Sequence, residues 1–289
     1  MMTQLCPLND FGGQGPTLHF AHANGYAPGV YRAFLSELAR DHHVLAAELR
    51  PLWQPPCEPE SVADWSVFGE DIARTLQADS RLSGEPVIAV GHSLGAFVTL
   101  MAAVRQPELF RALVLIEPPF LDFGRRMGLA VLGRLARHRV PLVARTLGRR
   151  DRWPSLEEAY DWFRAKPVFS RVSDDVLQDY VHYGTRAGAG NERKLYFSKH
   201  WEARIYTTIS NHAPLIRQCR VPVLALRGAR SDTLTPAVWQ QWQRLASPGD
   251  RFVEVPDTGH LLPLESPQRV AAVIRDELPA LLAQSGQVQ

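Results

Sequence analysis

Residues 86–95 read PVIAVGHSLG, an apolar run that leads into a serine with a glycine two positions away on either side. A parallel strand covered on both faces is continuously apolar, so residues 86–90 predict such a strand. The glycines permit a tight turn, and residues 94–106 predict a helix directly after it. The turn would lift the Ser93 hydroxyl clear of the backbone, beside a helix N-terminus whose dipole favours developing negative charge. A glycine-rich turn with an incidental serine is the alternative interpretation.

Short apolar segments alternate with helical patterns along most of the chain. Thr-Pro at 235–236 and Ser-Pro at 266–267 place a capping hydroxyl before a proline, which is a helix start signal. Such alternation predicts an α/β fold with a mostly parallel sheet and helices on both faces. The predicted strands are 17–23, 44–49, 86–90, 112–116, 221–226 and 251–255. The predicted helices are 31–40, 64–78, 94–106, one that starts at 236 and one over 267–282. Ser61 is the predicted cap of the helix 64–78.

The interval from 118 to 212 interrupts this alternation. It contains no convincing apolar strand, and its helical candidates are 123–136, 156–164 and 173–183. We therefore predict a core formed by residues 1–117 and 213–289, into which residues 118–212 are inserted as a helical cap.

Composition bounds the class of protein. With 289 residues and 45% hydrophobic content the chain can form a proper core, and a formal charge of +2 is too small to indicate nucleic acid or a membrane surface as partner. The three cysteines are scattered in no ligand-like spacing, which predicts a reducing compartment and neither a disulfide nor a metal site. The sequence has no signal peptide or membrane-spanning run, so we expect a cytoplasmic protein.

A serine hydroxyl becomes a nucleophile when a base takes its proton, and that base needs an orienting acid. His260 follows the strand 251–255 and Asp232 follows the strand 221–226, so both lie at the edge where ligands and catalytic groups gather in open α/β folds. A surface-loop histidine and a turn aspartate are the corresponding structural alternatives. Ser93, Asp232 and His260 in this order therefore predict a catalytic triad.

Four segments resemble the motifs of the α/β-hydrolase family. They are GHSLG at 91–95, GARSD at 228–232, GH at 259–260 and HANG at 22–25. The resemblance covers nearly the whole chain outside residues 118–212. It implies Ser93 as nucleophile, His260 as base and Asp232 as acid, with the backbone N–H groups of Leu94 and Asn24 as the oxyanion hole.

Glu117 is the alternative acid, because some members of the family carry the acid after the strand that corresponds to 112–116. A structural carboxylate bonded to loop amides is the other interpretation of this residue. The chain also departs from the family in two places. Ala23 replaces the glycine that usually follows the oxyanion-loop histidine, and only sixteen residues precede the first strand, which predicts a shortened edge with one hairpin around Gly12 and Gly13.

The resemblance implies a serine hydrolase that works through an acyl-enzyme, with no metal or cofactor and a small-molecule acyl substrate as its partner. A carboxylic ester with a mainly apolar acyl group is expected, because esterases are abundant in the family and a cap can enclose an apolar pocket. Other functions on the same scaffold stay open as alternatives. They are a thioesterase, an amidase, a C–C hydrolase, a perhydrolase or lyase, and a non-hydrolytic receptor. Nine arginines between Arg125 and Arg152 fit either an anionic substrate or a solvated helix face. The sequence predicts no oligomeric state.

Overall fold

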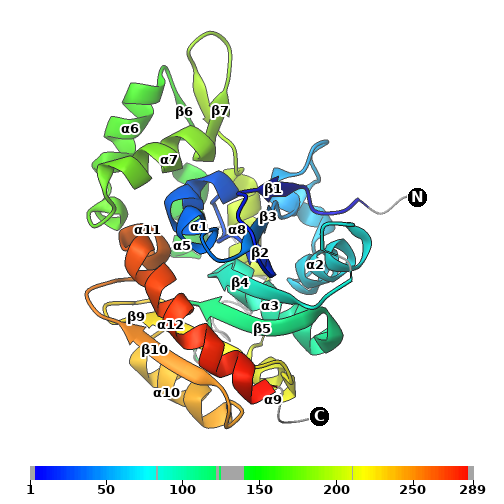
Figure 1. Cartoon of the computed structure of the whole chain (residues 1–289). Coiled ribbons are helices and arrows are strands. Elements are labelled where there is room, and N and C mark those ends of the chain that lie inside the picture. Colours follow the sequence, from blue (N-terminus) through cyan, green and yellow to red (C-terminus); the bar gives the residue numbers. More distant parts are fainter. Residues whose placement is uncertain (1–3, 83, 122–123, 125–139, 210, 286–289) are drawn as a thin grey trace.

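A seven-stranded sheet forms the centre of the molecule (Figure 1). The computed structural model describes residues 4–82, 84–121, 124, 140–209 and 211–285. The strand order is β1-β3-β2-β4-β5-β9-β10, and every neighbouring pair is parallel except β1 with β3. The strands are β1 (Leu8–Asp10), β2 (Thr17–Ala21), β3 (His43–Ala47), β4 (Val87–His92), β5 (Phe110–Ile116), β9 (Val223–Gly228) and β10 (Arg251–Val255).

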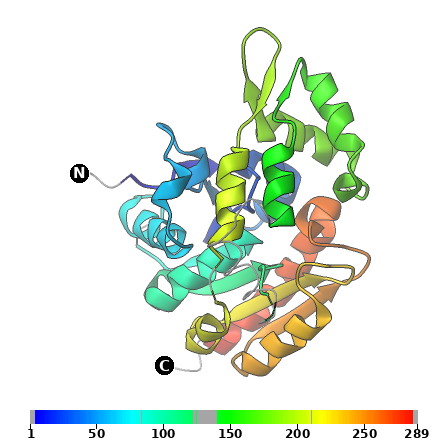
Figure 2. The ribbon, with the colours of Figure 1, turned by 180° about the vertical axis from the view of Figure 1, so that it is seen from behind.

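Helices cover both faces of the sheet, as Figures 1 and 2 show from opposite sides. On one face α1 packs against α12, and on the other α2 packs against α3, which also contacts α9. All six residues of β4 are buried, as expected for a central parallel strand. These observations confirm the predicted α/β fold. The helices of this part are α1 (Arg32–Leu38), α2 (Ser66–Ala78), α3 (Leu94–Arg105), α9 (Ala213–Gln218), α10 (Pro236–Leu245), α11 (Leu262–Glu265) and α12 (Pro267–Ser285).

The amino-terminal edge differs from the predicted hairpin. β1 pairs antiparallel with β3, in a register that sets Leu8 opposite Ala47, and not with β2, which follows it in the chain. β3 therefore lies between β1 and β2, and the connection around Gly12 and Gly13 crosses the end of β3. Gly13 has a φ of 90°, and a Cβ on it would lie 2.0 Å from the carbonyl oxygen of His42. The glycine is thus needed for this crossing and not for a hairpin turn.

Two predicted helix caps have different outcomes. Thr235 is the N-cap of α10, and its hydroxyl accepts a hydrogen bond from the Val238 N–H at 3.5 Å, as predicted. Ser61 is not the cap of α2, because it ends a 3-10 turn and its hydroxyl donates to the carbonyl of Glu58. Near the start of α2, the Asp64 carboxylate instead accepts a hydrogen bond from the backbone N–H of residue 66 at 2.7 Å.

Residues 118–212 contain both helices and strands. A small antiparallel sheet of order β6-β8-β7 corrects the prediction of a purely helical insertion. Its strands are only two or three residues long, too short to show an apolar period in the sequence. The predicted helix 123–136 falls, apart from Gly124, outside the described residues. The elements described are α5 (Pro141–Gly148), β6 (Arg152–Trp153), α6 (Leu156–Arg164), α7 (Asp174–Gly184), β7 (Thr185–Ala187), β8 (Arg193–Leu195) and α8 (Lys199–Thr207).

Polar contacts tie this segment to the core. Arg32 Nε donates to Asp179 Oδ1 at 2.9 Å, which joins α1 to α7. The indole N–H of Trp65 donates to the carbonyl of Ile205 at 3.1 Å, which joins the start of α2 to α8. α7 also packs on the 3-10 turn Pro28–Tyr31, a few residues after the segment that resembles an oxyanion loop. The segment therefore stands next to the predicted site.

At 19 residues, α12 is the longest helix that the structure describes. Its buried side chains Val270, Ala271, Ile274, Leu278 and Leu281 recur at helical spacing and form one apolar face. Gln268, Arg269 and Asp276 are exposed on the outer side, so the helix forms a layer on the sheet with its apolar face inward. Within the described ranges, no helix combines the length and apolar content needed to cross a membrane.

His19 on β2 predicts an acid-sensitive fold. Its side chain is fully buried, and neither ring nitrogen has a hydrogen-bond partner in the described structure. Burial lowers the pKa of His19 to about 4, from an ordinary value of 6.5. Between these values the unfolded chain binds a proton that the folded chain does not. The free energy of unfolding therefore falls as the pH falls through this window, by about 1.4 kcal/mol per pH unit.

His19→Leu is expected to remove this contribution. In urea unfolding at pH 7 and pH 5, the stability lost on acidification should be smaller in His19→Leu than in the wild type by about 2 kcal/mol. His22 and His92, whose pKa values are also lowered by burial, act in the same direction and stay in place. His200→Gln, at an exposed position, is the control. Equal acid sensitivity in the wild type and His19→Leu would contradict the prediction.

Candidate active site

Ser93 stands in a strained turn between β4 and α3. Its backbone has φ 53° and ψ −118°, a conformation that residues other than glycine rarely adopt. Its N–H donates to the carbonyl of Ile116 at 2.9 Å. Such strain is characteristic of a nucleophile elbow, because it projects the side chain away from the strand. Ser93 is 8% exposed, so its hydroxyl is almost enclosed by neighbouring groups.

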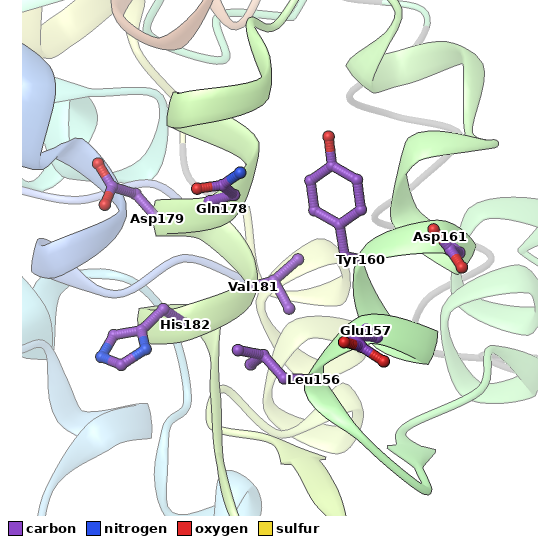
Figure 3. Close-up of a pocket in the computed structure, with 8 residues that line it drawn as sticks. All are labelled: Leu156, Glu157, Tyr160, Asp161, Gln178, Asp179, Val181 and His182. Atoms are coloured by element: carbon purple, nitrogen blue, oxygen red, sulfur yellow. The ribbon is translucent and has the colours of Figure 1, made fainter.

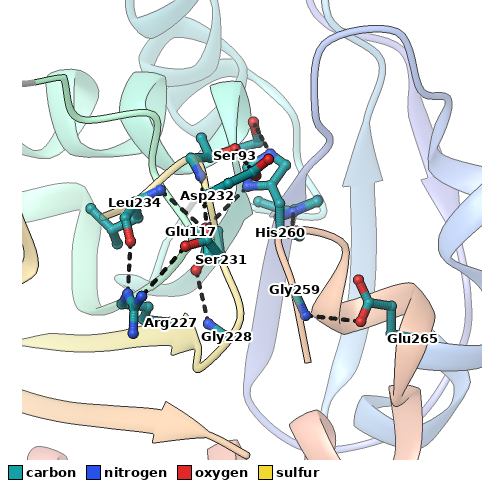
Figure 4. A network of polar contacts seen from close by, with 12 residues as sticks. Ser93, Glu117, Arg227, Gly228, Ser231, Asp232, Leu234, Gly259, His260 and Glu265 are labelled. Atoms are coloured by element: carbon teal, nitrogen blue, oxygen red, sulfur yellow. Dashed lines mark hydrogen bonds and ion pairs between the residues drawn. The ribbon is translucent and has the colours of Figure 1, made fainter. Parts of the chain in front are cut away.

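Ser93, His260 and Glu117 form a continuous chain of polar contacts (Figure 4). His260 Nε2 lies 3.1 Å from Ser93 Oγ, and His260 Nδ1 lies 3.1 Å from Glu117 Oε2. A carboxylate only accepts hydrogen bonds, so Nδ1 carries the ring proton and Nε2 is left to accept from the serine. This is the arrangement in which an imidazole can take a proton from a serine hydroxyl.

The Glu117 carboxylate is fully buried and has three hydrogen-bond donors. Besides His260, the Gly228 N–H donates to Oε1 at 2.8 Å and the Ser231 hydroxyl donates to Oε2 at 2.5 Å. Glu117 follows β5 directly and has a φ of 51°, and its own N–H donates to the carbonyl of Leu226 on β9. The carboxylate is thus held where β5 and β9 end, and these donors offset the cost of burying it.

No hydrogen bond or ion pair joins His260 to Asp232, which the sequence predicted as the orienting acid. It is exposed, and the hydrogen bond found for its carboxylate is from the Thr233 hydroxyl at 3.5 Å. The reason lies in the preceding residue. Ser231 is turned inward to donate to Glu117, so the next side chain along the loop faces solvent. The contact expected of Asp232 is made by the alternative acid, Glu117.

A buried relay joins the loop of His260 to residues 22–25. We call this segment the oxyanion loop, after the motif that its sequence resembles. The Ala23 N–H donates to Tyr31 Oη at 3.2 Å, and Tyr31 Oη lies 2.8 Å from His92 Nδ1. His92 Nε2 lies 2.8 Å from the carbonyl oxygen of His260. Burial lowers the pKa of His92 to about 3, so the ring is neutral, accepts from Tyr31 and donates to His260. His92 therefore braces the site and is not its base.

Sequence reasoning missed Tyr31 in this relay. Tyr31 lies 61 residues from His92 along the chain, and no local motif links the two. A second brace is His22, whose Nε2 accepts from the Leu49 N–H at 3.1 Å and whose Nδ1 lies 2.9 Å from the Ala23 carbonyl. Burial lowers the pKa of His22 to about 4, which keeps this ring neutral as well.

The two predicted oxyanion donors lie on adjoining segments. Leu94 is the first residue of α3, where backbone N–H groups have no partner within the helix. Asn24 lies in the oxyanion loop, and its side-chain amide donates to the carbonyl of Glu202 on α8 at 3.2 Å. Gly95, next to Leu94, touches the other segment: a Cβ on Gly95 would lie 2.8 Å from the carbonyl oxygen of His22. The elbow and the oxyanion loop are thus in close contact.

A separate cleft of about 660 Å³ lies between α6 and α7 (Figure 3). It is lined by Leu156, Glu157, Tyr160, Asp161, Gln178, Asp179, Val181 and His182. Among the described residues, none of the hydrogen-bond partners found for Ser93 or Glu117 belongs to this lining. The cleft is therefore a feature of the 118–212 segment and not part of the Ser93 site.

Comparison with known proteins identifies the family. A model of the alpha/beta hydrolase family matches residues 20–273. The 2-(acetamidomethylene)succinate hydrolase of Mesorhizobium japonicum is 24% identical over 268 residues, which cover 93% of this chain and 90% of that protein. Lipase LipV of Mycobacterium tuberculosis is 27% identical over 220 residues, 75% of this chain and 77% of the lipase. The crystal structure of E-2-(acetamidomethylene)succinate hydrolase has a TM-score of 0.76 at 22% identity and covers 93% of both chains. The relatives of this protein include a hydrolase and a lipase. The chain belongs to the alpha/beta hydrolase family.

Proposed function

We propose that the protein is a serine hydrolase that cleaves carboxylic esters through an acyl-enzyme. The observation that carries the proposal is the unbroken contact chain from Ser93 Oγ through His260 to the buried Glu117 carboxylate. In this proposal Glu117, and not Asp232, is the acid of the triad. Residues 118–212 act as the cap that covers the site.

In the first half of the reaction, Ser93 Oγ attacks the acyl carbon while His260 Nε2 takes the hydroxyl proton. Glu117 stabilises the imidazolium through the Nδ1–H hydrogen bond and keeps the ring in the required orientation. The N–H groups of Leu94 and Asn24 hold the negative oxygen of the tetrahedral intermediate. One such donor is worth about 3–4 kcal/mol in other enzymes. His260 then protonates the departing alkoxide, which leaves the acyl group on Ser93.

In the second half, water attacks the ester bond to Ser93 with His260 as the base. The same oxyanion donors hold the second tetrahedral intermediate, and its collapse returns the proton to Ser93 and releases the carboxylic acid. An ester is the substrate class that we infer, because relatives of this chain include a lipase as well as other hydrolases.

Labelling with a fluorophosphonate probe tests the nucleophile. Wild-type protein is expected to be labelled to about one probe per chain, because the probe reacts with an activated serine, and Ser93→Ala is expected to be unlabelled. Ser93→Ala should also lose at least about 10³-fold in kcat on p-nitrophenyl esters. Ser170→Ala, at an exposed serine, is the matched control and should label like the wild type. An unlabelled wild type, or a labelled Ser93→Ala, would overturn the proposal.

A further inference from the structure

A partly buried arginine with an unused hydrogen-bonding edge lies next to the oxyanion loop. Arg149 directly follows α5, and its Nη1 forms an ion pair at 2.8 Å with Glu202 Oε2 of α8. Its Nε and Nη2 atoms are buried and have no hydrogen-bond partner among the described residues. These two N–H groups share one edge of the guanidinium, and that edge can bind both oxygens of a carboxylate at once.

Glu202 connects this arginine to the oxyanion loop. The Asn24 amide donates to the Glu202 carbonyl, and a Cβ on Gly25 would lie 3.3 Å from Glu202 Oε2. Asn24 Oδ1 is itself buried without a partner in the described structure. In Figure 2 the green helix α5 and the yellow-green helix α8 stand side by side above the sheet, and the two helices are in contact. We call Arg149, Glu202 and Asn24 the Arg149 cluster.

Tyrosines lie near the Arg149 cluster. The ring centroids of Tyr26 and Tyr180 are 5.4 Å apart, and the Tyr206 hydroxyl donates to Glu202 Oε1 at 3.5 Å. Burial raises the pKa of Tyr180 to about 12, and the positive charge of Arg149 opposes this rise. The guanidinium therefore lies near the Tyr180 phenol. Each buried donor without a partner costs about 1–3 kcal/mol. A fold that leaves two on one edge is therefore expected to satisfy them with a ligand.

The other arginines of this region that the structure describes point elsewhere. Arg145, Arg150 and Arg152 are exposed, which fits a solvated surface. Arg149 is the inward-facing one among these four, and its side chain is 22% exposed. The two interpretations of the arginine-rich sequence thus apply to different residues.

We propose that the Arg149 cluster binds a carboxylate of the substrate, so that the preferred substrates are esters with a free carboxylate in the acyl chain or in the alcohol. The inference rests on the proposed function and names its substrate class. The two carboxylate oxygens accept from Nε–H and Nη2–H, while Glu202 keeps Nη1 in place. Burial raises the pKa of the Glu202 carboxyl, and the positive charge of Arg149 opposes this rise.

Pairs of esters that differ only in this charge test the proposal. In the first pair the variable group is on the acyl chain: monomethyl glutarate carries a carboxylate where methyl 5-methylhexanoate carries an isopropyl group. In the second pair it is on the alcohol: 4-acetoxybutanoate carries the carboxylate and 4-methylpentyl acetate the isopropyl group. The measurement is the ratio of kcat/KM for the charged ester to that for its neutral partner, by pH-stat titration. In the wild type the ratio should exceed one for at least one pair, and Arg149→Gln should lower that ratio at least about tenfold.

Two further variants separate recognition from folding. Arg149→Lys keeps a positive charge beside Glu202 but lacks the two-donor edge, so it should also lower the ratio while retaining the fold. Arg145→Gln, at an exposed arginine on α5, is the matched control and should leave the ratio unchanged. Ratios that are equal in the wild type, Arg149→Gln and Arg149→Lys would overturn the carboxylate site.

Binding without turnover distinguishes this failure from failure of the proposed hydrolase. If the wild type cleaves no ester and Ser93 is not labelled, the hydrolase proposal fails by itself. Calorimetric titration of wild type and Arg149→Gln with glutarate then decides the site. Saturable binding that Arg149→Gln weakens at least about tenfold supports the site, and equal or absent binding in both proteins overturns it.

Discussion

Glu117→Gln is expected to lower kcat on an ester substrate by about 10⁴-fold, the effect known for the equivalent amide substitution in another serine hydrolase. The amide retains the volume of the side chain but loses the charge that stabilises the imidazolium. It can also turn its NH₂ group toward His260 Nδ1, which favours the tautomer that carries the proton on Nε2. His260 could then no longer accept the proton of Ser93. Steady-state kinetics and the rate of fluorophosphonate labelling measure the loss.

Asp232→Asn is the matched control for this prediction. Asp232 is exposed and has no hydrogen bond to His260, so its amide variant should keep kcat within about threefold of the wild type. Circular dichroism and thermal unfolding show whether either variant has lost its fold. A larger loss of kcat in Asp232→Asn than in Glu117→Gln would return the acid to the position that the sequence motif favoured.

Gly95→Ala is expected to destabilise the fold by about 3 kcal/mol or more and to lower kcat at least about 100-fold. A Cβ on Gly95 would lie 2.1 Å from the carbonyl oxygen of Ala21 and 2.4 Å from its carbonyl carbon. Both atoms belong to the backbone at the end of β2, so the clash cannot be relieved by a side-chain rotation. The oxyanion loop follows this point directly, so its displacement would also move the Asn24 N–H, one of the two proposed oxyanion donors.

Gly148→Ala provides the control for a change of glycine to alanine. A Cβ on Gly148 would meet no atom within 4 Å, and Gly148 ends a helix in which alanine is favoured. Its thermal midpoint should stay within about 2 °C of the wild type, whereas Gly95→Ala should lower the midpoint by roughly 6–12 °C. A Gly95→Ala protein with wild-type midpoint and kcat would show that β2 and the elbow can separate without cost.

The difference between the acid that the motif predicted and the carboxylate that contacts His260 illustrates the reach of a sequence motif. The segment 228–232 does lie beside the proposed triad, but it contributes through Gly228 and Ser231, which hold the carboxylate of Glu117. Which side chain of a loop points inward depends on backbone torsions and on partners from other strands. His260 and Glu117 are 143 residues apart, so no local pattern carries that information.

The sequence by itself determined the alternation of strands and helices and the strand–turn–helix at Ser93, because both depend on short-range patterns of apolar residues and glycine. It could not determine the pairing of β1 with β3, the relay from Tyr31 to His92, or the inward orientation of Arg149 among exposed arginines. These features were decided by the tertiary structure. Each joins segments that are distant along the chain, so their contacts form only when the chain has folded.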